Sequence, residues 1–228
     1  MKENIFYIVA TPIGNLKDIS LRALEVLKEV DLILCEDTRV TKKLLSFYNI
    51  KKPLFSYHQH TSQKKIDYIL DLIEKGKKIA LVCDAGTPTI SDPGFFLIRQ
   101  IRERFKDKVK ITSIPGASAF LCCASLSGFP MEKFLFLGFP PKKKKRKKFF
   151  EKIKEFDYPI ILYESCHRIL KTLEDLKKVA KEREVVVCRE LTKMFETVYW
   201  GKIEKVIEKI KNDSQKGEFV IILGPKKI

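Results

Sequence analysis

The sequence predicts an α/β protein of two domains: an N-terminal, mostly parallel sheet with helices on both faces, and a C-terminal mixed α/β sheet. Two observations predict it. Strand-like and helical segments alternate through the first half, and the strand-like runs there are almost continuously apolar, as in parallel sheets covered on both faces. In the second half, strands outnumber helices slightly. The chain has 228 residues, enough for two small cores. We expect domains at 1–113 and 114–228.

Each strand of the first half is followed by a turn, and most of the strands then lead into a helix. Ser20 is expected to cap the first helix and Gly76 to end the third. The expected strands are 5–10, 31–36, 53–57, 78–84 and 108–114, and the expected helices are 21–30, 38–48, 62–76 and 95–105.

The second half begins with a short helix of small residues after the PGASA turn. A lysine run, 142–148, interrupts the regular pattern and is expected to be a loop. The expected strands are 134–139, 158–164, 184–190, 197–201 and 218–224, and the expected helices are 167–181 and 202–212.

Composition indicates a cytoplasmic protein with an anionic partner. No apolar run reaches the ~18–20 residues of a membrane span, and no secretory leader is recognisable. The six cysteines form no C-x-x-C pair, so we interpret them as reduced core thiols, and we expect no metal. The net charge of +16 favours nucleic-acid contact, although a lysine-rich source would also raise it.

Four turns at strand ends are rich in Gly, Pro and small polar residues: ATPIGN (10–15), EDTR (36–39), DAGTPTISDPG (84–94) and PGASA (115–119). Ligands of open α/β sheets bind beyond the carboxyl ends of the strands, and glycine lets the main chain approach a ligand closely. Any one of these turns is typical of an ordinary connection, but together they predict a ligand site built from main chain. None is a dinucleotide fingerprint or a phosphate-binding P-loop.

These turns, with YESCHRI, CRELTK and GEFVIIL, occur in an order that resembles the tetrapyrrole methylase superfamily. Within it, the chain is most similar to the bacterial small-subunit ribosomal RNA cytidine 2′-O-methyltransferases. Cys166 and Cys83 depart from that pattern, standing where proline and serine are usual. The resemblance implies S-adenosylmethionine (AdoMet) as cofactor in a cleft between two domains, small-subunit ribosomal RNA as substrate, and a homodimer. Because the chain has a basic run but no evident sequence-reading module, we expect the assembled 30S subunit to be preferred over free RNA.

The resemblance also implies a set of cofactor contacts. Residues near the ends of the first-domain strands would line the site, hold the methionine end of AdoMet and flank it from the hinge: Pro12, Gly14, Asp84, Ala85, Gly86, Thr87, Ile90, Ser113, Ala117 and Ser118. Three residues of the second domain would surround the adenine: Tyr163, Leu191 and Phe219. Taken singly, Tyr163 also fits a core position and Asp84 a helix cap.

The basic run is the expected RNA contact, because the resemblance implies a basic loop beside the substrate cleft, and lysine and arginine bind phosphates. Its residues, with one arginine further along, are Lys142, Lys143, Lys144, Lys145, Arg146, Lys147, Lys148 and Arg168. A solvated loop with no partner is the alternative.

A ribose 2′-hydroxyl must lose its proton to accept a methyl group. The candidate residues for this step are Glu36, Arg39, Glu164, Glu190 and Lys193. A desolvated Lys193 beside Arg189 would be neutral and act as the base, whereas an Arg189–Glu190 ion pair would be structural. Two other functions stay open: methylation of a tetrapyrrole precursor, and non-catalytic RNA binding in ribosome assembly.

Overall fold

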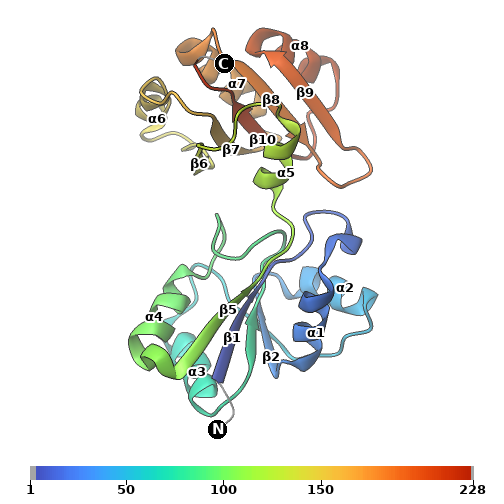
Figure 1. Ribbon diagram of the computed structural model, residues 1–228, viewed down its shortest axis with the longest axis vertical. Helices are drawn as coiled ribbons and strands as arrows, with labels where there is room; N and C mark the ends of the chain where they lie inside the picture. Colours follow the sequence, from blue (N-terminus) through green and yellow to red (C-terminus); the bar gives the residue numbers. More distant parts are fainter. Residues whose placement is uncertain (1–3, 227–228) are drawn as a thin grey trace. The chain divides into compact units, whose positions relative to one another are not determined.

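A computed structural model describes residues 4–226 of the protein. The chain divides into two compact units, Met1–Ser118 and Ala119–Ile228, each with its own five-stranded sheet (Figure 1). The division falls five residues after the expected boundary, because the PGAS turn that follows the last strand of the first sheet packs with the first unit.

The first sheet is entirely parallel, as predicted, with the order β3-β2-β4-β1-β5. Its strands are β1 (Asn4–Val9), β2 (Leu32–Cys35), β3 (Leu54–Ser56), β4 (Ile79–Leu81) and β5 (Val109–Ile114). The central strand β4 is shorter than expected, although the Val82 N–H still donates to the Leu34 carbonyl at 2.9 Å. All five strands point their carboxyl ends toward the same edge.

Helices cover both faces of this sheet. Apolar residues of α1 and α2 pack on one face and those of α3 and α4 on the other, forming two separate clusters. The predicted cap is present, since the Ser20 hydroxyl accepts the Ala23 N–H at 3.1 Å. The helices are α1 (Leu21–Glu29), α2 (Thr38–Phe47), α3 (Gln63–Glu74) and α4 (Phe95–Phe105), with short 3-10 turns at Leu16–Asp18 and Lys106–Lys108.

The second sheet is mixed, with the order β6-β7-β10-β8-β9. Only β6 and β7 are parallel, and the other neighbours are antiparallel. Its strands are β6 (Leu135–Gly138), β7 (Ile160–Ser165), β8 (Glu184–Arg189), β9 (Thr197–Lys202) and β10 (Glu218–Leu223). The predicted fold class, a parallel sheet followed by a mixed one, is confirmed.

One face of the second sheet carries a large apolar cluster with α6 (Arg146–Ile153), α7 (Ile169–Ala180) and α8 (Ile203–Asn212). The short helix α5 (Ala119–Leu126) packs on β7, β8 and β10, and the Cys123 thiol lies 3.9 Å from the Val220 carbonyl oxygen. The expectation of a loop over the whole basic run was wrong, because residues 146–148 form the first turn of helix α6. Among residues 4–226, no helix is both long and apolar enough to cross a bilayer.

Candidate functional site

The turns after β1 and β4 are joined through their main chains. The Thr11 N–H donates to the Gly86 carbonyl at 2.8 Å, and the Gly86 N–H donates back to the Thr11 carbonyl at 3.0 Å. The buried Thr11 hydroxyl also donates to the Cys83 carbonyl at 3.0 Å. Three hydrogen bonds therefore hold ATPIGN beside DAGTP. Thr11 belongs to the ATPIGN motif but was not among the predicted site residues.

The other two turns attach to the same loop. The Asp37 N–H, after β2, donates to Asp84 Oδ1 at 3.0 Å. The Thr87 hydroxyl donates to the Ala117 carbonyl, after β5, at 3.4 Å. All four of the predicted turns thus meet at the carboxyl edge of the first sheet, which follows from the parallel direction of its strands.

Two positions at this edge require glycine, one for its backbone conformation and one for the close packing of main chain. Gly86 has φ +86°, a conformation that costs an L-residue energy, although a Cβ there would meet nothing closer than 3.6 Å. Gly116 is required for space, because a Cβ there would lie 3.0 Å from the Ala10 Cβ. The glycines of the DAGTP and PGASA turns therefore allow the main chains at the sheet edge to pack closely together.

The rest of the loop after β4 is strained. Thr89 and Ser91 both have positive φ, +76° and +64°. A β-branched residue in this region is a conformational outlier. Between them, Ile90 is 40% exposed. Strain of this kind is found at ligand-binding and catalytic loops when the surrounding structure maintains it.

Three carboxylates influence one another at this edge: Glu36 after β2, and Asp84 and Asp92 after β4. Burial, together with the charges of Glu36 and Asp84, raises the pKa of Asp92 to about 6. Burial and the charge of Asp84 also raise the pKa of Glu36. Negative charge gathered at one end of a sheet favours a cationic ligand. Sequence reasoning missed Asp92, although the DAGTPTISDPG motif contains it.

Arg39 belongs to a local ion pair on the surface. Its Nη2 lies 2.7 Å from Asp37 Oδ2, and its side chain is 87% exposed. The hydrogen bonds from the Arg39 side chain and backbone lower the pKa of Asp37 to about 2. Asp37 also caps α2, accepting the Arg39 N–H at 2.8 Å. The EDTR motif therefore combines a helix start with an exposed guanidinium.

In the second unit, Tyr163 lies in an aromatic group at the end of β7. Its ring centroid is 5.0 Å from that of Phe136 and 5.5 Å from that of Phe139. The Phe139 side chain is 54% exposed, and Tyr163 is half-buried. A partly open aromatic surface of this kind is suited to stacking on a flat ring.

The expected role of the Phe219 side chain is wrong. Phe219 pairs with Glu164 on β7, whereas Tyr163 pairs with Val220. Because side chains alternate along a strand, Phe219 and Tyr163 point to opposite faces of the sheet. Phe219 is 2% exposed within the apolar cluster that α7 and α8 cover. Val220 therefore shares the face of Tyr163.

The turn after β8 repeats the strain seen after β4. Glu190 and Thr192 have φ +51° and +65° and flank Leu191, which is buried. Both of the expected contacts Ile90 and Leu191 thus sit between two residues with positive φ. The cost of each such residue is about 1–2 kcal/mol, which indicates that the shape of the turn is required.

The neutral Lys193 base is also wrong. Lys193 Nζ lies 2.9 Å from Glu190 Oε1 and 2.7 Å from Glu218 Oε2. Burial acts to lower the pKa of Lys193, but the bonds to Glu218 and Glu190 outweigh it and leave the pKa above its ordinary value. Lys193 is therefore charged at neutral pH, and Glu190 is its partner. The expected alternative pair fails too, since Arg189 Nε donates to the Lys216 carbonyl.

Glu164 and Arg168 form an internal pair, with Arg168 Nη2 2.7 Å from Glu164 Oε1. The Glu164 side chain is fully buried, so it cannot reach a substrate. Arg168 also donates to the Pro140 carbonyl at 2.9 Å. Neither the catalytic role expected of Glu164 nor the RNA contact expected of Arg168 fits these positions.

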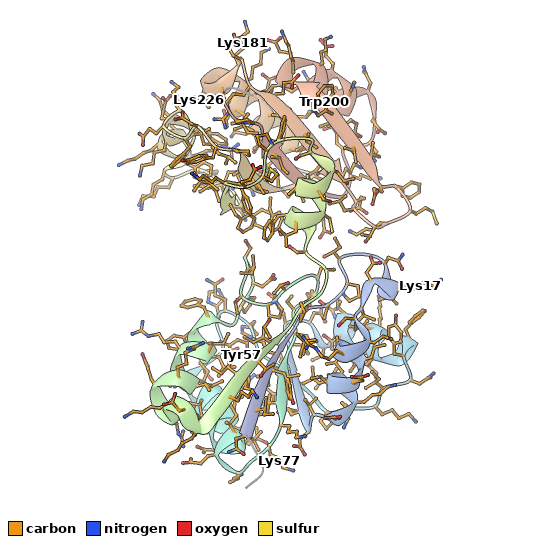
Figure 2. All side chains as sticks on the ribbon, viewed as in Figure 1. Lys17, Tyr57, Lys77, Lys181, Trp200 and Lys226 are labelled. Atoms are coloured by element: carbon orange, nitrogen blue, oxygen red, sulfur yellow. The ribbon has the colours of Figure 1, made fainter. Side chains whose placement is uncertain are left out.

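Six of the seven residues in the basic run, Lys142–Lys145 with Lys147 and Lys148, are exposed. The exception is Arg146, which is 6% exposed and bonded internally, so its expected RNA contact is wrong. Lysines elsewhere are spread over both units: Figure 2 shows Lys17, Lys77, Lys181 and Lys226 at their surfaces. Residues 142–148 are the only place where seven basic residues follow one another.

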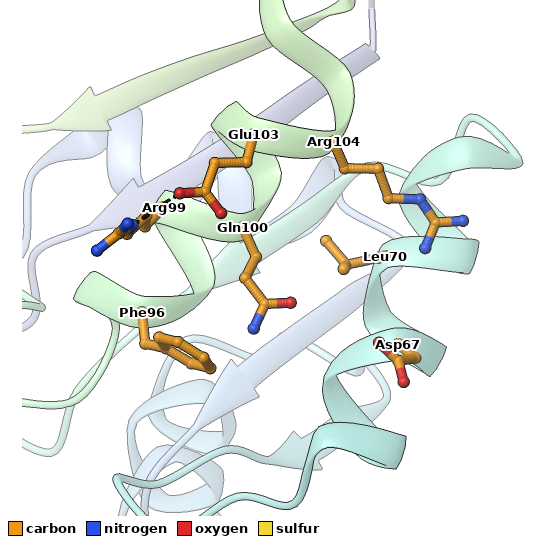
Figure 3. Close-up of a pocket in the computed structure, with 7 residues that line it drawn as sticks. All are labelled: Asp67, Leu70, Phe96, Arg99, Gln100, Glu103 and Arg104. Atoms are coloured by element: carbon orange, nitrogen blue, oxygen red, sulfur yellow. Dashed lines mark hydrogen bonds and ion pairs between the residues drawn. The ribbon is translucent and has the colours of Figure 1, made fainter.

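The remaining expected contacts all belong to the first unit. Pro12, Gly14, Ala85, Ser113 and Ser118 lie in the turns or strand ends of the first unit, and Pro12 is buried. A separate surface groove of about 630 Å³ lies over α3 and α4 (Figure 3). Both of its arginines are paired with carboxylates, Arg99 with Glu103 and Arg104 with Asp71.

The fold and the main-chain site are features of a protein family, and comparison with known proteins identifies that family. The family described as Tetrapyrrole (Corrin/Porphyrin) Methylases matches residues 6–207, and the chain belongs to it. Similar solved structures include a cobalt precorrin-4 methyltransferase (TM-score 0.69, 16% identity, 97% of this chain and 95% of that one) and a diphthine synthase (TM-score 0.68, 15% identity, 96% and 89%). At these identities the likeness is one of fold.

Curated relatives are more similar in sequence. Proteins named "Ribosomal RNA small subunit methyltransferase I" from Thermotoga maritima and Mycoplasmopsis pulmonis are 43% and 49% identical to the chain. The matches cover 96% and 95% of this chain and 97% and 96% of those proteins. A relative of the same name from Haemophilus influenzae is 48% identical over 97% of this chain and 79% of its own length.

The protein is therefore a methyltransferase whose cofactor is S-adenosyl-L-methionine. The structure of the first unit fits this cofactor. The glycine turns form the carboxyl edge of its sheet from main chain, and the carboxylates of Glu36, Asp84 and Asp92 match the two positive charges of the cofactor, the ammonium and the sulfonium.

Proposed function

We propose that this protein methylates the ribose 2′-oxygen of a cytidine in small-subunit ribosomal RNA. Similarity over nearly its full length to relatives whose name gives that RNA as substrate carries the proposal. The exposed lysines of 142–148 support it, because they offer a site for phosphates. An enzyme acting on ribosomal RNA in a bacterium works in the cytoplasm.

The cofactor would be held mainly by the first unit. Asp84 would bind the ammonium group, and the main-chain N–H groups of Ala85 and Thr87 would donate to the carboxylate. Gly86, whose N–H is bonded to the Thr11 carbonyl, would hold the turn in place beside them. From the second unit, Tyr163 would stack on the adenine with Leu191 beside it. Pro12, Gly14, Ile90, Ser113, Ala117 and Ser118 would complete the site.

Bound AdoMet supplies a methyl group that the sulfonium has already activated. The protein must then align the ribose oxygen, exclude water and accept the proton of the 2′-hydroxyl. Glu36 is the candidate that suits the last step. It is exposed at the carboxyl edge of the first sheet, and burial and the charge of Asp84 raise its pKa. A base with a raised pKa holds the abstracted proton better than an ordinary carboxylate does.

The lysines would bind the RNA backbone without selecting its sequence, so selection would come from the shape of the 30S particle. We therefore expect 30S subunits to be methylated faster than naked RNA. Replacing all six exposed lysines of 142–148 with glutamine should weaken 30S binding and reduce the salt dependence by about 0.7–0.9 in log–log slope per lost phosphate contact. AdoMet affinity should not change.

The deciding experiment incubates 30S subunits with the protein and labelled AdoMet and locates the label by mass spectrometry of nuclease fragments. Label on a cytidine ribose supports the proposal, whereas label on a base, or none, refutes it. Glu36→Gln should lose turnover at saturating AdoMet but keep 30S binding. The same incubation with a tetrapyrrole precursor in place of 30S is the control for the other open activity, and AdoMet binding without methylation would indicate a non-catalytic factor.

We also propose that the protein is a homodimer. Its one tryptophan, Trp200 on the edge strand β9, is 56% exposed, and Phe195 and Met194 nearby are 66% and 90% exposed. A second copy that covers this apolar edge would protect it from water. Sedimentation equilibrium gives the mass, and Trp200 fluorescence on dilution reports whether this edge is covered.

A further inference from the structure

Arg146, the one arginine within the basic run, is buried, whereas the six lysines around it are exposed. The Arg146 side chain is 7% exposed, and all three of its nitrogens are bonded within the second unit. Nε donates to Asp175 Oδ2 at 2.9 Å, Nη2 to the Thr172 hydroxyl at 2.8 Å, and Nη1 to the Pro141 carbonyl at 3.1 Å. The guanidinium also lies 4.8 Å from the centroid of the Phe150 ring.

The bonds continue inward from Thr172. The Thr172 hydroxyl, which is fully buried, donates to Glu164 Oε2 at 2.6 Å. The other oxygen of Glu164 binds Arg168, and Arg168 donates to the Pro140 carbonyl. Two arginines therefore bind the carbonyls of Pro140 and Pro141, the two residues directly before the lysines.

The backbone of the run is folded rather than extended. The Arg146 N–H donates to the Lys143 carbonyl at 3.2 Å, and the Phe149 N–H to the Lys145 carbonyl at 2.9 Å. Lys145 has φ +65°, which a lysine adopts only when its surroundings enforce it. Adjacent lysines repel one another and would extend a free chain, so this compact turn needs an anchor.

We propose that Arg146 is the positioning residue of the RNA-binding segment: together with Asp175, Thr172 and Glu164 it fixes the six exposed lysines in one arrangement for phosphates. The proposal rests on the proposed RNA substrate. Fixing the lysines in advance removes an ordering cost that a free loop would pay on binding. Only arginine provides three donors in a rigid plane, so a lysine at this position cannot replace it.

Asp175 provides the sharpest test, because it lies on α7, outside the basic run. Asp175→Asn removes a negative charge, so charge alone predicts tighter binding to 30S subunits. Positioning predicts weaker binding. Arg146→Lys keeps the charge and should weaken binding as well. The loss of one phosphate contact should lower the affinity for 30S subunits roughly sixfold at 0.1 M salt. We expect both variants to lose more than this, with a reduced salt slope, and the KM for 30S subunits to rise more than kcat falls.

The matched controls are Lys147→Met, which removes one exposed charge and should cost no more than about sixfold, and Lys181→Met, which should cost nothing. AdoMet titration and thermal unfolding verify that each variant is folded. Hydrogen exchange of the α6 amides, residues 146–153, should be faster in Arg146→Lys and Asp175→Asn than in wild type. If Arg146→Lys binds like wild type, if Asp175→Asn binds more tightly, or if exchange is unchanged in both, the proposal is wrong.

The proposed RNA function can be refuted independently of the positioning role of Arg146. If the variant with all six lysines replaced binds 30S subunits like wild type, the lysines are not the RNA contact. Hydrogen exchange of the α6 amides still tests in that case whether Arg146 and its partners fix the segment, because this measurement needs no RNA. If the six-lysine variant loses binding and the anchor variants do not, only the positioning role is refuted.

Discussion

Replacing Asp92 with asparagine should make the protein more stable at neutral pH. Burial and the charges of Glu36 and Asp84 raise the pKa of Asp92 to about 6, from an ordinary value of 3.8. A difference of one in pKa corresponds to ~1.4 kcal/mol between the two protonation states, so the ionised carboxylate costs the folded state up to about 3 kcal/mol. Because Asp92 is only partly buried, we expect Asp92→Asn to recover about 2 kcal/mol at pH 7.5.

The pH dependence follows from the direction of the shift. A carboxyl whose pKa is higher in the folded state binds its proton more tightly there, so its contribution to stability is fully present below pH 3.8 and is lost as the pH rises through 6. The gain from Asp92→Asn should therefore be near zero at pH 3.5 and reach its full value above pH 7.

The assay is urea unfolding followed by circular dichroism at several pH values. Hydrogen exchange of β1 and β4 assigns the transition to the first unit. Leu121→Ala, an exposed residue of the second unit, is a control that should not reproduce the pH dependence. A variant no more stable than wild type at pH 7.5, or equally stabilised at pH 3.5, would refute the reasoning. The same charge should attract the cofactor, so Asp92→Asn should bind AdoMet less tightly than wild type does.

Three other predictions concern the cofactor and the core. AdoMet should bind in the presence of EDTA, as isothermal titration can show, and its affinity should fall below pH 6 as Asp92 becomes protonated. Gly86→Ala should cost about 1–2 kcal/mol of unfolding free energy, because Gly86 has a positive φ. A larger side chain at this position would therefore disturb the fold as well as the site. For this reason, AdoMet affinity must be compared among variants that remain folded. Arg183→Met should destabilise the second unit in urea unfolding by about 1–3 kcal/mol for each carbonyl left without a donor, because the buried guanidinium bonds the carbonyls of Gly224, Phe156 and Tyr158.

Local and periodic features of the chain were predictable. The alternation of strands and helices gives the parallel sheet, and parallel strands bring their following turns to one edge. This is why ATPIGN, EDTR, DAGTP and PGASA could be expected to meet before any contact was known. The Ser20 cap is another local feature, set by one hydroxyl and the helix after it.

Features that depend on distant partners were not predictable. The face to which Phe219 points depends on its register with β7, and register is set by pairing across the sheet. Lys193 is charged because Glu218, 25 residues away, meets it. Arg146 could not be distinguished from its six neighbours, because its partners Thr172 and Asp175 are brought to it only by the packing of α6 on α7. Asp92 was missed because its pKa depends on charges after two different strands.

The order of strands in the second sheet affects how the protein is made. The first sheet is complete once Ile114 has been synthesised, so this unit can fold while the rest of the chain is still being translated. The second sheet must wait, because β10 lies between β7 and β8 and is the last strand in the sequence. Until residues 218–223 emerge, β7 and β8 have no strand between them, and their apolar residues stay exposed to water and to other chains. A ribosome that stops before residue 218 would therefore release a product with one folded half and one half prone to aggregation.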